Sequence, residues 1–222
     1  MFNTFKRNWG TTIGLLALGS ISILFGVLQI TFLTLGDAAN EHGIVEPHYR
    51  VMPVPILVHI LTGSLFNLTS PFQFAPIVRR RWPKFHRAMG RILLVCGFLI
   101  GASGIWMNVV YPDYGGTAKY AGILTMSIIM ILATPIAVLY ARIGKISEHT
   151  LWMKIAVAIT LSPATQRLFL IPILLIFGED IMSHALIGGS IWAGMIINLG
   201  VVFWTEQTNS GTTTKLLHNY KE

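Results

Sequence analysis

The chain has 222 residues, of which 53% are hydrophobic and only 11% are charged, and its mean hydropathy is +0.64. A soluble domain carries about 25% charged residues, so this composition predicts an integral membrane protein. The net charge of +7 does not indicate a nucleic-acid partner, because the basic residues form short clusters between apolar segments. The single cysteine, Cys96, excludes an intramolecular disulfide, a cysteine-based zinc site and covalent haem attachment through a C-x-x-C-H motif.

Six segments are long and apolar enough to cross a bilayer, which takes about 20 residues of helix. They cover approximately residues 11–35, 54–78, 92–110, 122–140, 151–177 and 185–204. We therefore expect an all-α integral membrane helical bundle that forms one domain over residues 1–204. Residues 205–222 are rich in Ser, Thr and Gly, which predicts a flexible cytoplasmic tail.

The basic residues predict the orientation of these spans. Of the 16 Lys and Arg residues, all but three fall on connections or ends that share one side of the membrane. The exceptions are Arg50 and Lys119 on the other side and Arg167 inside the fifth span. The positive-inside rule then places both termini in the cytoplasm of a bacterial cell, with the protein in the inner membrane and lipid as its partner.

The second span carries a polar stripe that a lipid-facing helix would not tolerate. At about 100° per residue, His59, Thr62, Gly63, Ser70 and Gln73 lie on one side of the helix. Hydrogen bonding between helices is one interpretation of such a stripe. A functional role for His59 is the other, because polar side chains at membrane depth face protein or water and often serve function.

His86 lies at the cytoplasmic end of the helix that contains the third span, and glycines follow it on the same face at Gly90, Gly97 and Gly104. Gly97 and Gly101 form a G-x-x-x-G pattern, which is typical of closely packed helices. A histidine above a groove of glycines also suits a porphyrin, since imidazole binds iron and missing side chains admit the ring.

The fifth span holds two polar groups on one face, His149 and Arg167, which are 18 residues or five helical turns apart. Small residues such as Ala156 and Ala164 lie between them and leave room for a neighbouring backbone or a flat ligand. Pro163 lacks an N–H and frees a carbonyl one turn earlier. A purely structural Arg167 that extends toward the interface is the alternative.

Several of these residues occur in an order that resembles a known bacterial membrane family, domain of unknown function 2306. The resemblance rests on His59–Gly63, Pro71–Phe74, Arg79–Pro83, His86–Arg87, Gly90–Arg91, Glu148–His149, Trp152–Met153 and Arg167. It covers roughly residues 54–170 and departs from the family at Ile155, where the family has an arginine and this chain has Lys154 just before. The family name implies no reaction. A looser similarity is to haem proteins of the cytochrome b561 kind.

The first functional hypothesis is a b-type haem electron carrier that exchanges electrons with a quinol and a redox partner protein. His86 and His149 would be the axial ligands, and His59 would be a further ligand or part of a quinol site. The other residues expected to contact the cofactor are Gly90, Gly97, Arg87 and Gln73.

The second hypothesis is a membrane enzyme or binding protein for a small amphiphile such as a quinone or an isoprenoid lipid. His59 would act as acid or base, and Arg167 would hold an anionic or carbonyl oxygen. A third interpretation is an accessory structural subunit with no cofactor. The predicted spans contain no Asp or Glu, which weighs against a proton-coupled transporter.

Overall fold

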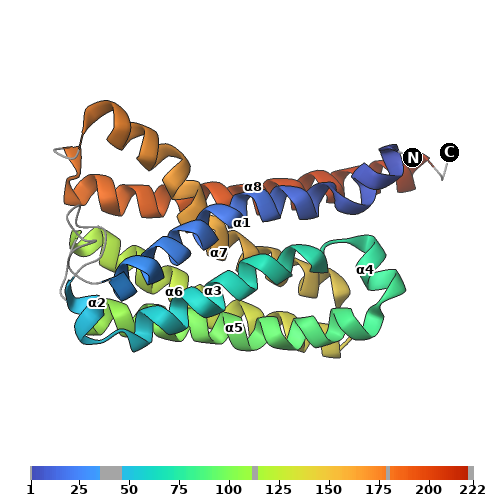
Figure 1. The fold of residues 1–222 in the computed structure, drawn as a ribbon. Coiled ribbons are helices and arrows are strands. Elements are labelled where there is room, and N and C mark those ends of the chain that lie inside the picture. Colours follow the sequence, from blue (N-terminus) through green and yellow to red (C-terminus); the bar gives the residue numbers. More distant parts are fainter. Residues whose placement is uncertain (1, 36–46, 112–114, 179–180, 220–222) are drawn as a thin grey trace.

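The structure is a computed structural model that describes residues 2–35, 47–111, 115–178 and 181–219, with the side chains of 2–8, 47 and 209–219 outside the description. In chain order the helices are α1 (Phe2–Leu35), α2 (Pro47–Val51), α3 (Val54–Gln73), α4 (Pro76–Arg81), α5 (Pro83–Val110), α6 (Gly116–Arg142), α7 (Ile146–Phe177) and α8 (His184–Asn219) (Figure 1). Of these, α1, α3, α5, α6, α7 and α8 are long and apolar enough to span a membrane. The predicted all-α fold with six membrane-spanning helices is confirmed.

The two ends of the bundle are distinguished by the chain termini and by two short helices. The first and last helices begin and finish at the same end, which we call the terminal end, and α4 lies there too (Figure 1). The opposite end, which carries α2, is the distal end. Which end faces the cytoplasm stays a prediction. So does the flexibility of the tail, because α8 continues through Asn219 and residues 220–222 lie outside the described residues.

Helix boundaries differ from the predicted spans where proline or charge intervenes. The predicted second span continues to residue 78, but α3 ends at Gln73 and α4 begins at Pro76, since proline cannot donate to the preceding turn. The helix of the third span begins at Pro83, nine residues before the predicted start. Hydropathy detects the part of a helix that is buried in lipid. It does not detect a basic helical turn that extends beyond that part.

Glycines let α5 approach α6 closely. A Cβ added at Gly97 would collide with the side chain of Thr134, and one at Gly101 would lie 2.6 Å from the Ser127 carbonyl oxygen. One at Gly104 would collide with the Ser127 hydroxyl. Helix packing is therefore what these glycines support in the structure.

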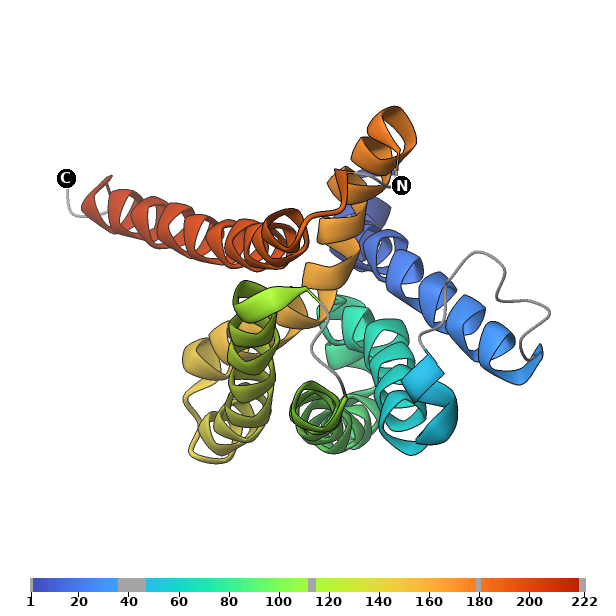
Figure 2. The ribbon, with the colours of Figure 1, turned by 90° about the vertical axis from the view of Figure 1, so that its left-hand side faces the viewer.

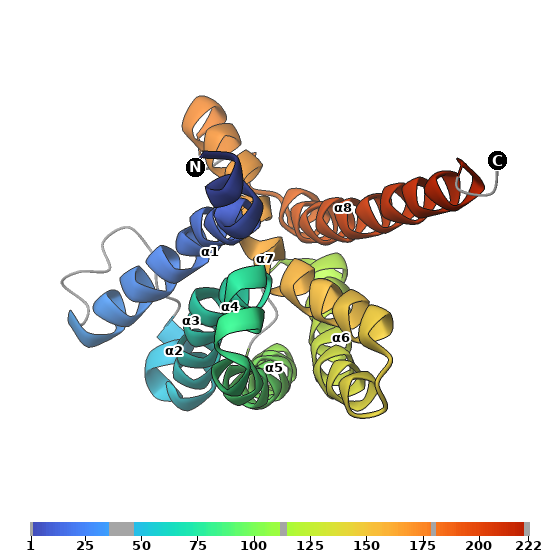
Figure 3. The same ribbon diagram turned by 90° about the vertical axis from the view of Figure 1, so that its right-hand side faces the viewer.

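The helix α7 runs through the middle of the bundle, with α1 and α8 diverging on either side of it (Figures 2 and 3). Hydrogen bonds between side chains hold α8 to α7. The Thr165 hydroxyl donates to Asn198 Oδ1 over 2.8 Å, and Gln166 Nε2 donates to the Ser190 hydroxyl over 2.8 Å. Prolines at 163 and 172 lie inside α7, and Figure 1 shows this helix crossing the bundle obliquely.

A tyrosine hydrogen bond joins two chain segments at the distal end. The Tyr111 hydroxyl, just after α5, donates to the Met52 carbonyl over 2.6 Å. Burial raises the pKa of Tyr111, so the hydroxyl stays a neutral donor at ordinary pH. The bond fixes the end of α5 against the turn that leads into α3.

Candidate functional site

A cavity of about 260 Å³ lies between α1, α3, α5, α6 and α7 in the distal half of the bundle. Its polar lining residues are Ser22, Gln29, His59, Ser64, Asn67, Ser127, Thr160 and Arg167, and the remaining lining is mostly isoleucine and methionine. Gly63 helps to keep the space open, because a Cβ added there would meet nothing within 4 Å. The structure thus brings His59 and Arg167, which are far apart in the sequence, to the walls of one cavity.

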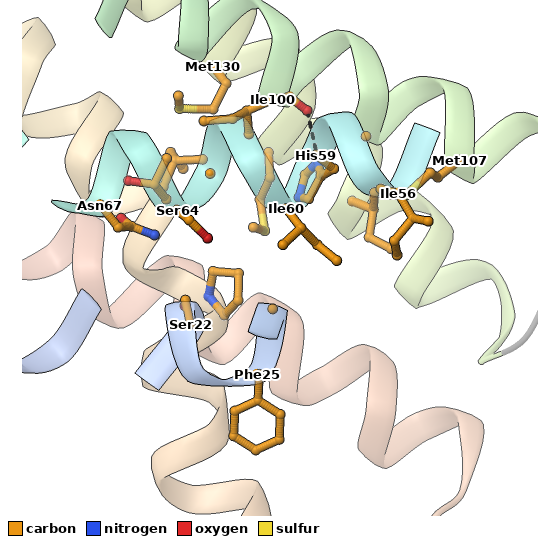
Figure 4. Close-up of a pocket in the computed structure, with 18 of the residues that line it drawn as sticks. Ser22, Phe25, Ile56, His59, Ile60, Ser64, Asn67, Ile100, Met107 and Met130 are labelled. Carbon is orange, nitrogen blue, oxygen red and sulfur yellow. Dashed lines mark hydrogen bonds between the residues drawn. The ribbon is translucent and has the colours of Figure 1, made fainter. Parts of the chain in front are cut away.

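The hydrogen bonds of His59 define its tautomer. His59 Nδ1 lies 3.2 Å from the Ile100 carbonyl oxygen and 3.0 Å from the Ser103 hydroxyl oxygen. The Ser103 hydroxyl donates its own proton to the Leu99 carbonyl over 2.6 Å, so both groups accept from Nδ1. Nδ1 therefore carries the proton in the neutral ring, and Nε2 is left with a free lone pair. Figure 4 shows the ring on α3 with α1 across the cavity.

Arg167 is a cation without a carboxylate partner among the described residues. Its NH1 donates to the Pro163 carbonyl over 2.9 Å, and its guanidinium lies 4.5 Å from the centroid of the Phe25 ring. These contacts use one of the five N–H donors and one face of the group. The other N–H donors are left for an oxygen that enters the cavity. Such a partner would offset the cost of placing a guanidinium at membrane depth.

The sequence did not reveal several residues of this site. Ser103 orients His59, Phe25 stacks on Arg167, and Ser22 lies on the α1 wall. No pattern identifies them, because helix neighbours cannot be read from hydropathy or period. Asn67 could have been identified from the sequence, because an amide within an apolar span is as unusual as the imidazole of His59.

The second pair of predicted histidines lies at the terminal end and does not line the cavity. His149 Nδ1 lies 2.8 Å from the Ala137 carbonyl oxygen and donates to it. His86 Nδ1 is buried and has no hydrogen-bond partner in the described part of the chain. The two imidazoles interact electrostatically. Within the described residues no three His, Cys, Asp or Glu side chains gather as a metal site, so His59 is not joined to this pair.

The remaining predicted cofactor residues differ in their surroundings. The space beside Gly97 is filled by Thr134, whereas a Cβ at Gly90 would meet nothing within 4 Å. Arg87 is exposed, and Gln73 is half-buried with an Nε2 that has no hydrogen-bond partner among the described residues. Arg87 and Gly90 follow His86 on α5 within about one helical turn, so their role beside a cofactor stays a prediction.

The fold and the site define a multi-pass helical membrane protein with a polar cavity inside the bundle. The chain belongs to the family described as predicted membrane protein (DUF2306), whose model matches residues 56–204. That range includes His59, His86, His149 and Arg167. No curated protein and no solved structure matches the chain. The looser similarity to cytochrome b561 stays a prediction.

Proposed function

We propose that the protein binds a small amphiphile with an oxygen-bearing head group in the distal cavity, and that His59 exchanges a proton with it. The observation that supports this function is that His59 and Arg167 line the same cavity. The cavity is larger than the roughly 150 Å³ site that is known to hold benzene, so one substituted ring or a short polar head fits it.

The two side chains have complementary chemistry. His59 Nε2 can accept a proton from a hydroxyl group, because its Nδ1 is already the donor. Arg167 supplies positive charge in a site of low dielectric, where it stabilises an anionic or carbonyl oxygen much more than it would in water. An anionic oxygen bound there in turn gives Arg167 the charged partner that it lacks among the described residues.

The location of the cavity favours an amphiphile over a water-soluble ligand. The walls between the polar groups are apolar, with Ile60, Ile100 and Met130 among them, and the surrounding helices lie in lipid. A ligand with an apolar tail reaches this depth by partitioning into the bilayer first. The bacterial inner membrane is the compartment that we infer from the charge distribution.

Binding of 2-decylphenol and of decanoate to the protein in nanodiscs tests this function, with empty nanodiscs as the blank. We expect saturable binding of at least one probe, and a loss of affinity of about tenfold or more in Arg167→Leu, because hydrogen bonds to charged groups contribute about 1.5–3 kcal/mol. Arg142→Leu, at the exposed end of α6, is the matched control. If Arg167→Leu does not fold, Arg167→Gln replaces it. Unsaturable binding of both probes, or unchanged affinity in the Arg167 variants, contradicts the function.

A second candidate, haem binding at the terminal end, has one observation in its favour. His149 donates Nδ1–H to a backbone carbonyl, which is the arrangement that orients most metal-binding histidines. Reduced and oxidised spectra of the purified protein test this candidate. A Soret band that is lost in both His86→Ala and His149→Ala supports it, and a colourless folded protein removes it.

A further inference from the structure

The distal cavity has polar groups at two separate ends and not only beside His59. Ser22 on α1 and Asn67 on α3 both line it, and Asn67 lies about two turns further along α3 than His59. The two helices meet at this depth, because a Cβ added at Gly19 would lie 3.3 Å from Asn67 Cβ. Figure 4 shows Asn67 and His59 on the α3 wall of the cavity, with Ser64 between them.

These two polar groups lack hydrogen-bond partners. Ser22 Oγ and Asn67 Oδ1 are buried without one in the described part of the chain, and Asn67 as a whole is only 5% exposed. An unsatisfied buried polar atom costs about 1–3 kcal/mol. Packing alone does not require an amide at position 67, because a leucine would fill the same space among apolar neighbours. The amide can present either its NH₂ or its carbonyl to a ligand, depending on its rotation.

From these positions we infer that the ligand has two oxygens at opposite ends of a compact apolar ring, one contacting His59 and the other contacting Asn67. This rests on the proposed function and specifies its substrate class as a ring with hydroxyl oxygens in the 1,4 arrangement, as in a quinol head group. His59 Nε2 accepts from a hydroxyl at one end, and the Asn67 amide binds the oxygen at the other.

The separation of the two residues along α3 is of the same order as the length of such a ring. His59 and Asn67 are eight residues apart on α3, which is about 12 Å along the helix axis. The two oxygens of a 1,4-substituted ring are about 5 Å apart, a distance close to the pitch of one helical turn. A hydrogen bond of about 3 Å at each end extends the reach to about 11 Å. A ring with both oxygens on one edge contacts only one end of the cavity.

Two isomeric probes with the same tail test the inference in nanodiscs under nitrogen. These are 2-decylbenzene-1,4-diol and 4-decylbenzene-1,2-diol, which contain the same atoms and differ in the placement of the hydroxyls. We expect the 1,4 isomer to bind at least tenfold more tightly. This preference falls to about twofold or less in Asn67→Leu and falls partly in Ser22→Ala, which is the milder variant if Asn67→Leu does not fold. Ser20→Ala, on the same helix but outside the cavity lining, keeps the preference.

The outcomes separate this inference from the proposed function. Equal affinity for the two isomers, or a preference that survives both Asn67→Leu and Ser22→Ala, overturns the two-ended ligand while the function stands if binding still depends on Arg167. Failure of the proposed function is different, because then neither isomer binds saturably or binding ignores Arg167.

Discussion

The distal and terminal ends of this bundle each contain histidines, but they surround them differently. At the distal end five helices leave a cavity, and His59 is oriented by Ser103 and Ile100 with a nitrogen free. At the terminal end His149 is tied to α6, and His86 lies on a helix that also bears exposed cations such as Arg87. Of the three histidines, only His59 lines the cavity, because only there does the helix packing leave this space.

The largest expected effect concerns the glycines between the two ends. Gly97→Ala should lower the free energy of unfolding by up to about 3 kcal/mol, because the new Cβ collides with Thr134 in a packed interface. Gly90→Ala is the matched control and should be neutral or stabilising by up to about 1 kcal/mol, since its surroundings are open. Thermal unfolding in detergent measures both. Equal stabilities for the two variants would indicate that Gly97 borders open space, as a porphyrin groove requires.

Replacing the distal cation should raise stability while it removes binding. Arg167→Leu loses its contacts with Pro163 and Phe25 but no longer places a guanidinium at membrane depth, where it costs about 2.5–3.5 kcal/mol. We expect a net gain of about 2 kcal/mol in the free energy of unfolding. A clear loss of stability in the same unfolding experiment would instead make Arg167 a structural residue.

Ser103 should affect binding through the orientation of His59. Ser103→Ala removes one acceptor from Nδ1, and we expect the affinity for 2-decylphenol to fall by about three- to tenfold, equivalent to about 1 kcal/mol. Ser162→Ala is the matched control, because that buried serine donates to a backbone carbonyl of its own helix in the same way but has no hydrogen bond to His59. Equal effects of the two variants on affinity would remove the positioning role.

The smallest effect is expected at an ion pair outside both regions. Lys154 on α7 binds Glu206 on α8, and their side chains are 27% and 36% exposed. Glu206→Gln should therefore change the free energy of unfolding by less than about 1 kcal/mol and leave probe affinity unchanged. A larger loss of binding would mean that the cavity depends on how α8 is held.

The sequence predicted the class of fold because hydropathy over about 20 residues records burial in lipid directly. It also indicated His59 and Arg167, since polar groups in apolar spans are conspicuous. It could not indicate that these two share a cavity while His86 and His149 lie apart from it, because that depends on which helices are neighbours. Gly97 is a second example, because the sequence does not distinguish a glycine beside a ligand from a glycine beside a threonine such as Thr134.

Affinity for 2-decylphenol in nanodiscs, compared among the wild type, His59→Leu, Arg167→Leu and His149→Leu, tests the central claim most directly. A shared distal cavity predicts that the first two variants each weaken the same ligand by about tenfold. The third variant, at the terminal end, should bind as the wild type does. Dependence on only one of the two distal residues, or an equal loss in His149→Leu, would contradict the account.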